Sequence, residues 1–119
     1  MWHSKRTWSI HTVSSAEELA KQLTDSTWTC CQAFQLGDYL FANDATCADG
    51  AQEYGVLKPH SESHWVQIES ITFSWCSFES ALKLIQQTLA GEYDAQNFGL
   101  VDRSQFQPER EHGTCGHCA

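Results

Sequence analysis

The most constraining feature of the chain is one dense apolar run, HWVQIESITFSWCSFESALKLIQQTLAG, from His64 to Gly91. Its first part, residues 65–75, is β-branched or aromatic at most positions, which is typical of a strand on a half-buried pleated surface. Its second part changes to a helical period, with an apolar stripe made by Phe78, Leu82, Ile85 and Leu89. The run predicts a strand that leads directly into an amphipathic helix, and most of the core should be built against it.

The strand half of this run also predicts a β-bulge, because its apolar residues change phase. Val66 and Ile68 share one face of a strand, whereas Ile71 and the two aromatic positions after it share the other. Side chains alternate with period two, so a bulge near residues 69–70 would keep all of them on one core. In the helix half, Ser77 is a suitable N-cap and Gly91 a suitable C′ residue. The residues expected to be nearly fully buried are Ile71, Phe73, Leu82 and Ile85.

The rest of the chain predicts four further strands and one further helix. The strands are expected over residues 7–13, 27–36, 39–45 and 51–58, and the helix over 14–25 with Ser14 or Ser15 as its cap. Gly37-Asp38 supplies a two-residue hairpin turn. The resulting order is β-α-β-β-β-β-α, in which short turns favour antiparallel pairing.

We therefore predict one α+β domain: a mostly antiparallel sheet of about five strands, with two helices on one face. Its boundaries are an N-terminal arm over residues 1–6, the α+β domain over 7–91, and a polar, irregular C-terminal extension over 92–119. The first residues contain no apolar run long enough for a signal peptide or a membrane span, so a cytoplasmic protein is expected.

Charge points to a class of partner. The chain has 15 acidic and 7 basic residues, a formal charge of −8, which argues against nucleic acid or a membrane as a direct partner. No Lys or Arg occurs between Lys21 and Lys58. The acidic residues of this segment are expected to be exposed and to bind a basic protein; the candidates are Asp38, Asp44, Asp49 and Glu53.

The last eight residues carry the most specific local motif. His112, Cys115 and Cys118 form an evenly spaced H-x-x-C-x-x-C with glycines between the ligands. Zinc and iron accept such ligands, and a structural zinc needs four. The fourth would come from another histidine or from one of the cysteines at positions 30, 31, 47 and 76. The alternative is a C-terminal tail whose thiols have no specific role.

Two short stretches resemble known families. The tetrapeptide Cys115-Gly-His-Cys118 resembles the redox motif of protein disulfide isomerases, which implies dithiol exchange. In that family the motif starts a helix that lowers the pKa of the attacking thiol, whereas here one residue follows Cys118. The β-α-β-β-β-β-α order and the run ESI…S…SALKLIQQTLAG resemble one family of bacterial toxin-immunity proteins, which implies an inhibitor of a basic partner.

Two function classes follow. The leading one is a small, acidic, non-catalytic interaction module of the inhibitor or immunity type. The alternative is a metal- or thiol-dependent protein centred on the C-terminal cysteines, with zinc as the cofactor. No phosphate-binding loop, dinucleotide glycine motif, G-x-S-x-G or H-E-x-x-H occurs, which lowers the odds of the common enzyme classes.

Overall fold

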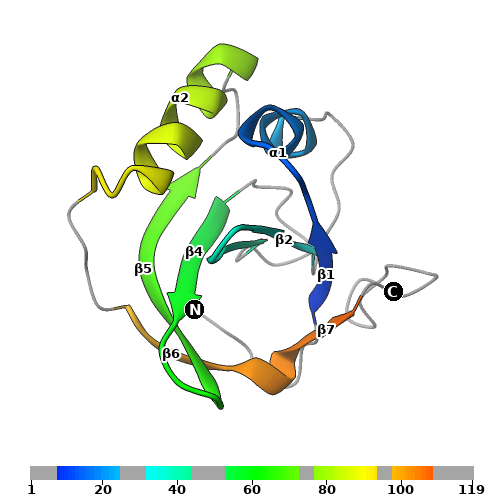
Figure 1. Ribbon diagram of the computed structural model, residues 1–119, viewed down its shortest axis with the longest axis vertical. Helices are drawn as coiled ribbons and strands as arrows, with labels where there is room; N and C mark the ends of the chain where they lie inside the picture. The colour runs from blue at the N-terminus through cyan, green and yellow to red at the C-terminus, as the bar shows by residue number, and fades with distance from the viewer. Residues whose placement is uncertain (1–7, 25–31, 44–52, 73–76, 94–97, 109–119) are drawn as a thin grey trace.

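The computed structural model describes residues 8–24, 32–43, 53–72, 77–93 and 98–108 (Figure 1). Seven strands, two α-helices and one short 3₁₀ helix occur in these ranges. In chain order they are β1 (Trp8–Thr12), α1 (Ala16–Leu23), β2 (Gln32–Leu36), β3 (Tyr39–Asn43), β4 (Glu53–Pro59), β5 (His64–Thr72), α2 (Phe78–Leu89), β6 (Gly99–Asp102), η1 (Arg103–Gln105) and β7 (Phe106–Pro108).

All seven strands belong to one sheet in the order β6-β5-β4-β3-β2-β1-β7. β2 to β6 pair antiparallel, while β1 pairs parallel with both β2 and β7. The two edge strands, β6 and β7, are separated in the chain only by η1. The sheet therefore curls so that the end of β6 lies next to the start of β7, and its strands form a ring. Figure 1 shows this ring with both helices outside it. The predicted α+β class, with a mostly antiparallel sheet and two helices, is confirmed.

The two helices begin at the residues that the sequence indicates. The Ser15 side chain accepts a hydrogen bond from the Glu18 backbone N–H, and Ser77 accepts one from Ser80. Each bond satisfies an N–H that the first helical turn leaves without a partner. Gly91 follows α2 with φ 77°, a left-handed conformation that glycine adopts without steric cost.

The predicted bulge is present in β5, one residue earlier than expected. Val56 pairs with Glu69 and Leu57 pairs with Gln67, so Ile68 is the extra residue. Ile68 is buried and packs with the helices, while Trp65 of the same strand packs on the opposite face of the sheet. Val66 and Ile71 lie on either side of the extra residue, and both pack against the core that the helices cover. The bulge therefore keeps apolar residues of opposite phase on one core, as the sequence predicts.

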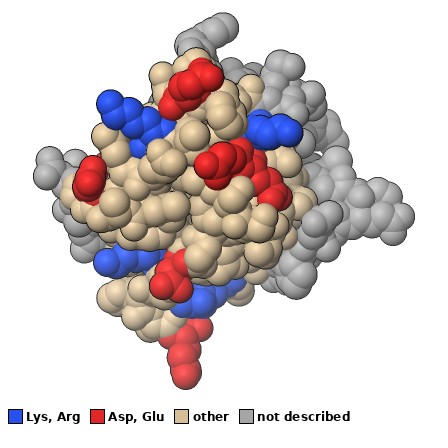
Figure 2. All heavy atoms as spheres, turned by 45° about the horizontal axis from the view of Figure 1, so that its top comes forward, with Lys and Arg blue, Asp and Glu red and all other residues tan. Residues whose placement is uncertain are grey.

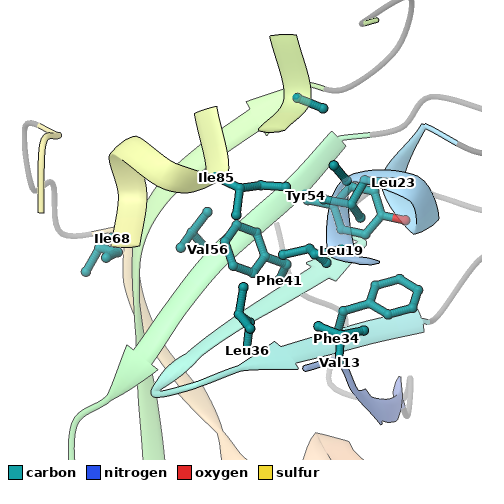
Figure 3. Packing of buried hydrophobic residues seen from close by; sticks show 12 residues of the cluster. Val13, Leu19, Leu23, Phe34, Leu36, Phe41, Tyr54, Val56, Ile68 and Ile85 are labelled. Carbon is teal, nitrogen blue, oxygen red and sulfur yellow. The ribbon is translucent and has the colours of Figure 1, made fainter. Parts of the chain in front are cut away.

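The outer core lies between the sheet and the two helices (Figure 3). The sheet contributes Phe34, Phe41 and Val56, and the helices contribute Leu19 and Ile85, all of them buried. Ile71 and Leu82 pack against this core but are only partly buried. The prediction that these two would be nearly fully buried is wrong. Ile71 lies beyond the part of β5, residues 64–67, that pairs with β6, and Leu82 packs at the border of the core. Ile85 is fully buried as predicted, and Phe73 lies outside the described residues.

The inner core fills the ring and is built around Trp8. The indole Nε1 donates a hydrogen bond of 2.7 Å to the backbone carbonyl of Asn43, two strands away from β1 in the sheet. To reach it, the ring must cross the inner face of β2. Small residues at the same level of four adjacent strands leave the room for it: Ala33, Ala42, Gly55 and Ser70 pair in succession.

Two features of the observed sheet differ from the sequence prediction. β5 was expected in the middle of the core, but β3 is the central strand and β5 is next to an edge. Part of the C-terminal extension is regular, because residues 99–108 form β6, η1 and β7. Val101 and Phe106 of this segment are buried in the inner core, so the segment completes the sheet. None of the described helices is long and apolar enough to cross a membrane.

Candidate functional site

The structure places the predicted acidic residues at different ends of the sheet. Asp38 is exposed in the turn between β2 and β3, whereas Glu53 starts β4 at the opposite end of β3. Six residue steps along a strand separate the two levels, which is roughly 20 Å. Asp44, Asp49 and the Glu53 side chain lie outside the described residues. Figure 2 shows acidic and basic side chains interspersed on the face that it presents.

The predicted metal ligands His112, Cys115 and Cys118 all lie outside the described residues. Within the described ranges, no group of three or more His, Cys, Asp or Glu side chains could hold a metal ion. The zinc site therefore stays a prediction about the C-terminal residues.

That prediction has a direct test. If the C-terminal motif binds zinc, the purified protein should contain about one zinc per chain, and Cys115→Ser should lose it. Because the motif comes after β7 in the chain, chelation should leave the far-UV circular dichroism of the sheet and helices unchanged. Zinc affinity should fall at low pH as the thiolates are protonated. Metal-free protein from zinc-supplemented cells would refute the site, and unfolding on chelation would show that it is central to the fold.

Charged and polar residues do gather at the tip of the β4–β5 hairpin, beside β6 and η1. The turn is held by two backbone hydrogen bonds, from the N–H groups of His60 and Ser61 to the carbonyl of His64. Arg103 of η1 donates from its backbone N–H to the Ser63 carbonyl at 3.0 Å and from Nε to the Ser61 carbonyl at 2.8 Å. Residues 42 positions apart in the chain are thus fixed against each other.

The Arg103 side chain also lies over an aromatic ring. Its guanidinium carbon is 4.5 Å from the centroid of the Trp65 ring, and Trp65 is buried in the inner core. A guanidinium stacked on an indole is attracted to the negative face of the ring. The inner core therefore positions a cationic side chain at the surface.

Ser63, His64 and Asp102 bring the residue types of a catalytic triad to the same hairpin, but not its geometry. Ser63 Oγ and His64 Nδ1 are 2.8 Å apart, and β5–β6 pairing sets His64 opposite Asp102. The carboxylate of Asp102 accepts instead from the Ser104 backbone N–H, which is the first cause of its lowered pKa; the charge of the nearby His64 acts in the same direction. A triad needs the carboxylate to orient the imidazole, and no such hydrogen bond joins these two residues in the structure described.

Next to this cluster, the edge strand β6 exposes large apolar side chains. Leu100 is 53% exposed, and Phe98, directly before the strand, is 47% exposed. Asp102 follows two residues later and is exposed as well. Single exposed apolar residues need no explanation, but two within three residues, next to a carboxylate, are typical of a contact surface.

A second group of polar residues is largely buried between the sheet and the helices. His11 Nε2 and Gln32 Oε1 form a short hydrogen bond, and Asn43 is hydrogen-bonded to Tyr54. Burial raises the pKa of the Tyr54 hydroxyl to about 12, and the bond to Asn43 opposes the rise. Because Gln32, Asn43 and Tyr54 are all buried, we assign this cluster a structural role.

Sequence reasoning missed the hairpin-tip site. Leu100 and Arg103 fall in a stretch with no clear periodicity, so nothing in the pattern separates an exposed leucine from a core leucine. The one available signal was the concentration of histidine, serine and glutamate at residues 60–64.

Comparison with known proteins identifies no relative. No protein-family model matches the chain, and no curated protein or solved structure is significantly similar to it.

Proposed function

We propose that this protein is a small, non-catalytic interaction module that binds a basic protein through β6. The observation that carries the proposal is the exposure of about half of the Phe98 and Leu100 side chains. Apolar side chains at the centre of a contact surface supply most of the binding energy, while charges around them select the partner.

Electrostatics favour a basic partner. The chain carries a formal charge of −8, and a net negative field raises the rate of encounter with a positively charged protein. Asp102 borders the apolar pair, and the hydrogen bonds to Ser104 hold its pKa below the ordinary value. Its carboxylate therefore stays ionised at neutral pH beside Leu100. Asp38 and the other acidic candidates would add to the long-range field.

Substitutions in β6 test whether this surface, and not another part of the molecule, binds the partner. The tagged full-length protein is cross-linked in an extract of its source cells, and captured proteins are quantified by mass spectrometry. Leu100→Glu should reduce capture of a specific basic protein at least tenfold, because it places a charge in the apolar centre. Asp102→Asn retains the side-chain acceptor for Ser104 and should slow association, with a weaker dependence on salt.

Matched controls come from other exposed positions. Leu89 is an exposed leucine on α2, and Glu92 is an exposed carboxylate after that helix. Leu89→Glu and Glu92→Gln should leave capture of the same protein unchanged. The proposal would be contradicted if Leu100→Glu and Leu89→Glu captured the same proteins in the same amounts. It would also be contradicted if the amount of captured protein rose with salt concentration.

A further inference from the structure

A shallow cavity at the hairpin tip is lined by charged side chains of both signs. Its volume is about 470 Å³, and the residues around it are Pro59, His60, Ser61, Glu62 and Arg103. In Figure 1 the hairpin that carries it projects beside β6 and the turn into β7. Glu62 is exposed, while Arg103 is partly buried.

The Arg103 wall is preorganised. The Arg103 backbone N–H donates a hydrogen bond to the Ser63 carbonyl, and Nε donates one to the Ser61 carbonyl. The guanidinium lies over the Trp65 ring. The turn that supplies these carbonyls is itself closed by two hydrogen bonds to His64. A side chain held in this way loses little conformational entropy when it binds a ligand, which strengthens each hydrogen bond that it forms.

Arg103 also has N–H donors that remain available for a ligand. A guanidinium has five N–H donors, and the bond from Nε to Ser61 uses one of them. Among the residues that the structure describes, the two terminal amino groups have no acceptor, and Glu62 forms no ion pair with them although it lines the same cavity. Paired N–H donors of this kind match the two oxygens of a carboxylate.

We infer that this cavity binds a ligand that carries a carboxylate and an ammonium group a few ångströms apart. Arg103 holds the carboxylate and Glu62 holds the ammonium. Glu62 disfavours a ligand with several negative charges, and Arg103 disfavours one with several positive charges, so the pair selects against both. A free amino acid has this chemistry, and so does a peptide that ends in lysine.

The two sources are distinguished by titrating defined probes into ¹⁵N-labelled full-length protein and following its NMR spectrum. Glycine stands for a free amino acid, and Nα-acetyl-lysine for a C-terminal lysine. Acetate and methylammonium carry one of the two charges each. At least one of the two-charge probes should shift the backbone signals of residues 60–64 and the Arg103 Nε–H signal saturably, with a roughly millimolar Kd. The one-charge probes should bind about tenfold more weakly or not at all.

Variants assign the binding to the two charged side chains. Arg103→Gln and Glu62→Gln should each weaken binding of the successful probe about tenfold. Glu62 forms no hydrogen bond within the described residues, so Glu62→Gln should leave the fold intact. It therefore tests the inference even if Arg103→Gln disturbs η1. Lys58→Gln, close in the chain but outside the cavity lining, is the matched control and should bind as the parent does.

Three outcomes would overturn the inference: acetate binding as tightly as glycine and acetyl-lysine, shifts that do not saturate, or variants at Arg103 and Glu62 that bind unchanged. The test is also independent of the proposed partner. Leu100 does not line the cavity, so Leu100→Glu should retain probe binding even where it abolishes partner capture.

Discussion

Trp8→Ala should destabilise the protein by about 3–5 kcal/mol, the largest effect that we expect from a single truncation. Trp8 is 1% exposed, its ring centroid is 5.7 Å from that of Phe106, and its Nε1 is bonded to the Asn43 carbonyl. The indole thus joins β1, β3 and β7 across the interior of the ring. The flanking alanines and glycine cannot expand into the space that it leaves, so the truncation creates a cavity.

Urea denaturation followed by far-UV circular dichroism measures this effect, because the backbone dominates the far-UV signal and the midpoint does not require fluorescence from the substituted tryptophan. Trp8→Phe keeps an aromatic ring but removes the N–H, and should cost about 1–3 kcal/mol. Leu89→Ala on α2, which truncates an exposed side chain, should cost less than about 1 kcal/mol. A Trp8→Ala midpoint as close to the parent as that of Leu89→Ala would show that the inner core does not depend on the indole.

The parts of the fold that local sequence signals determine were predictable. Ser15 and Ser77 start helices because their side chains can accept from N–H groups three residues later. Gly37-Asp38 forms a hairpin turn because Gly37 adopts φ 61°. The phase change in residues 66–71 predicted either a bulge or burial on both faces, and it favoured the bulge because an extra residue keeps all the apolar side chains on one core. Each of these signals lies within a few residues of its structural consequence.

The closure of the sheet depends on contacts that are distant in the chain, and the sequence pattern does not reveal it. β6 and β7 have four and three residues, too few for an alternating pattern to stand out from chance. Their position is decided by Val101 and Phe106, which enter a core to which all of β1 to β5 contribute. The hairpin-tip site depends on the same closure, because only the pairing of β6 with β5 brings Arg103 to Trp65 and Ser61.

The buried cluster of Asn43 and Tyr54 should make stability depend on pH in the alkaline range. Burial raises the pKa of Tyr54 from 10.0 to about 12. In the unfolded chain this hydroxyl ionises near pH 10, so between about pH 10 and 12 the unfolded state binds fewer protons than the folded state. The free energy of unfolding therefore falls as pH rises through this range, whereas below about pH 10 the full contribution is present. A shift of about two pKa units corresponds to roughly 3 kcal/mol in total, about half of which is lost by pH 11.

Comparison with Tyr54→Phe isolates this residue from the lysines and other tyrosines that titrate in the same range. At pH 8 the variant should be less stable than the parent by about 1–3 kcal/mol, because Asn43 loses a buried hydrogen-bond partner. Between pH 9 and 11 the parent should lose roughly 1 kcal/mol more than the variant, so the difference in unfolding free energy measured by urea denaturation should narrow. A gap that stays constant over this range would mean that Tyr54 ionises normally in the folded protein, and that water reaches the cluster which the structure shows as buried.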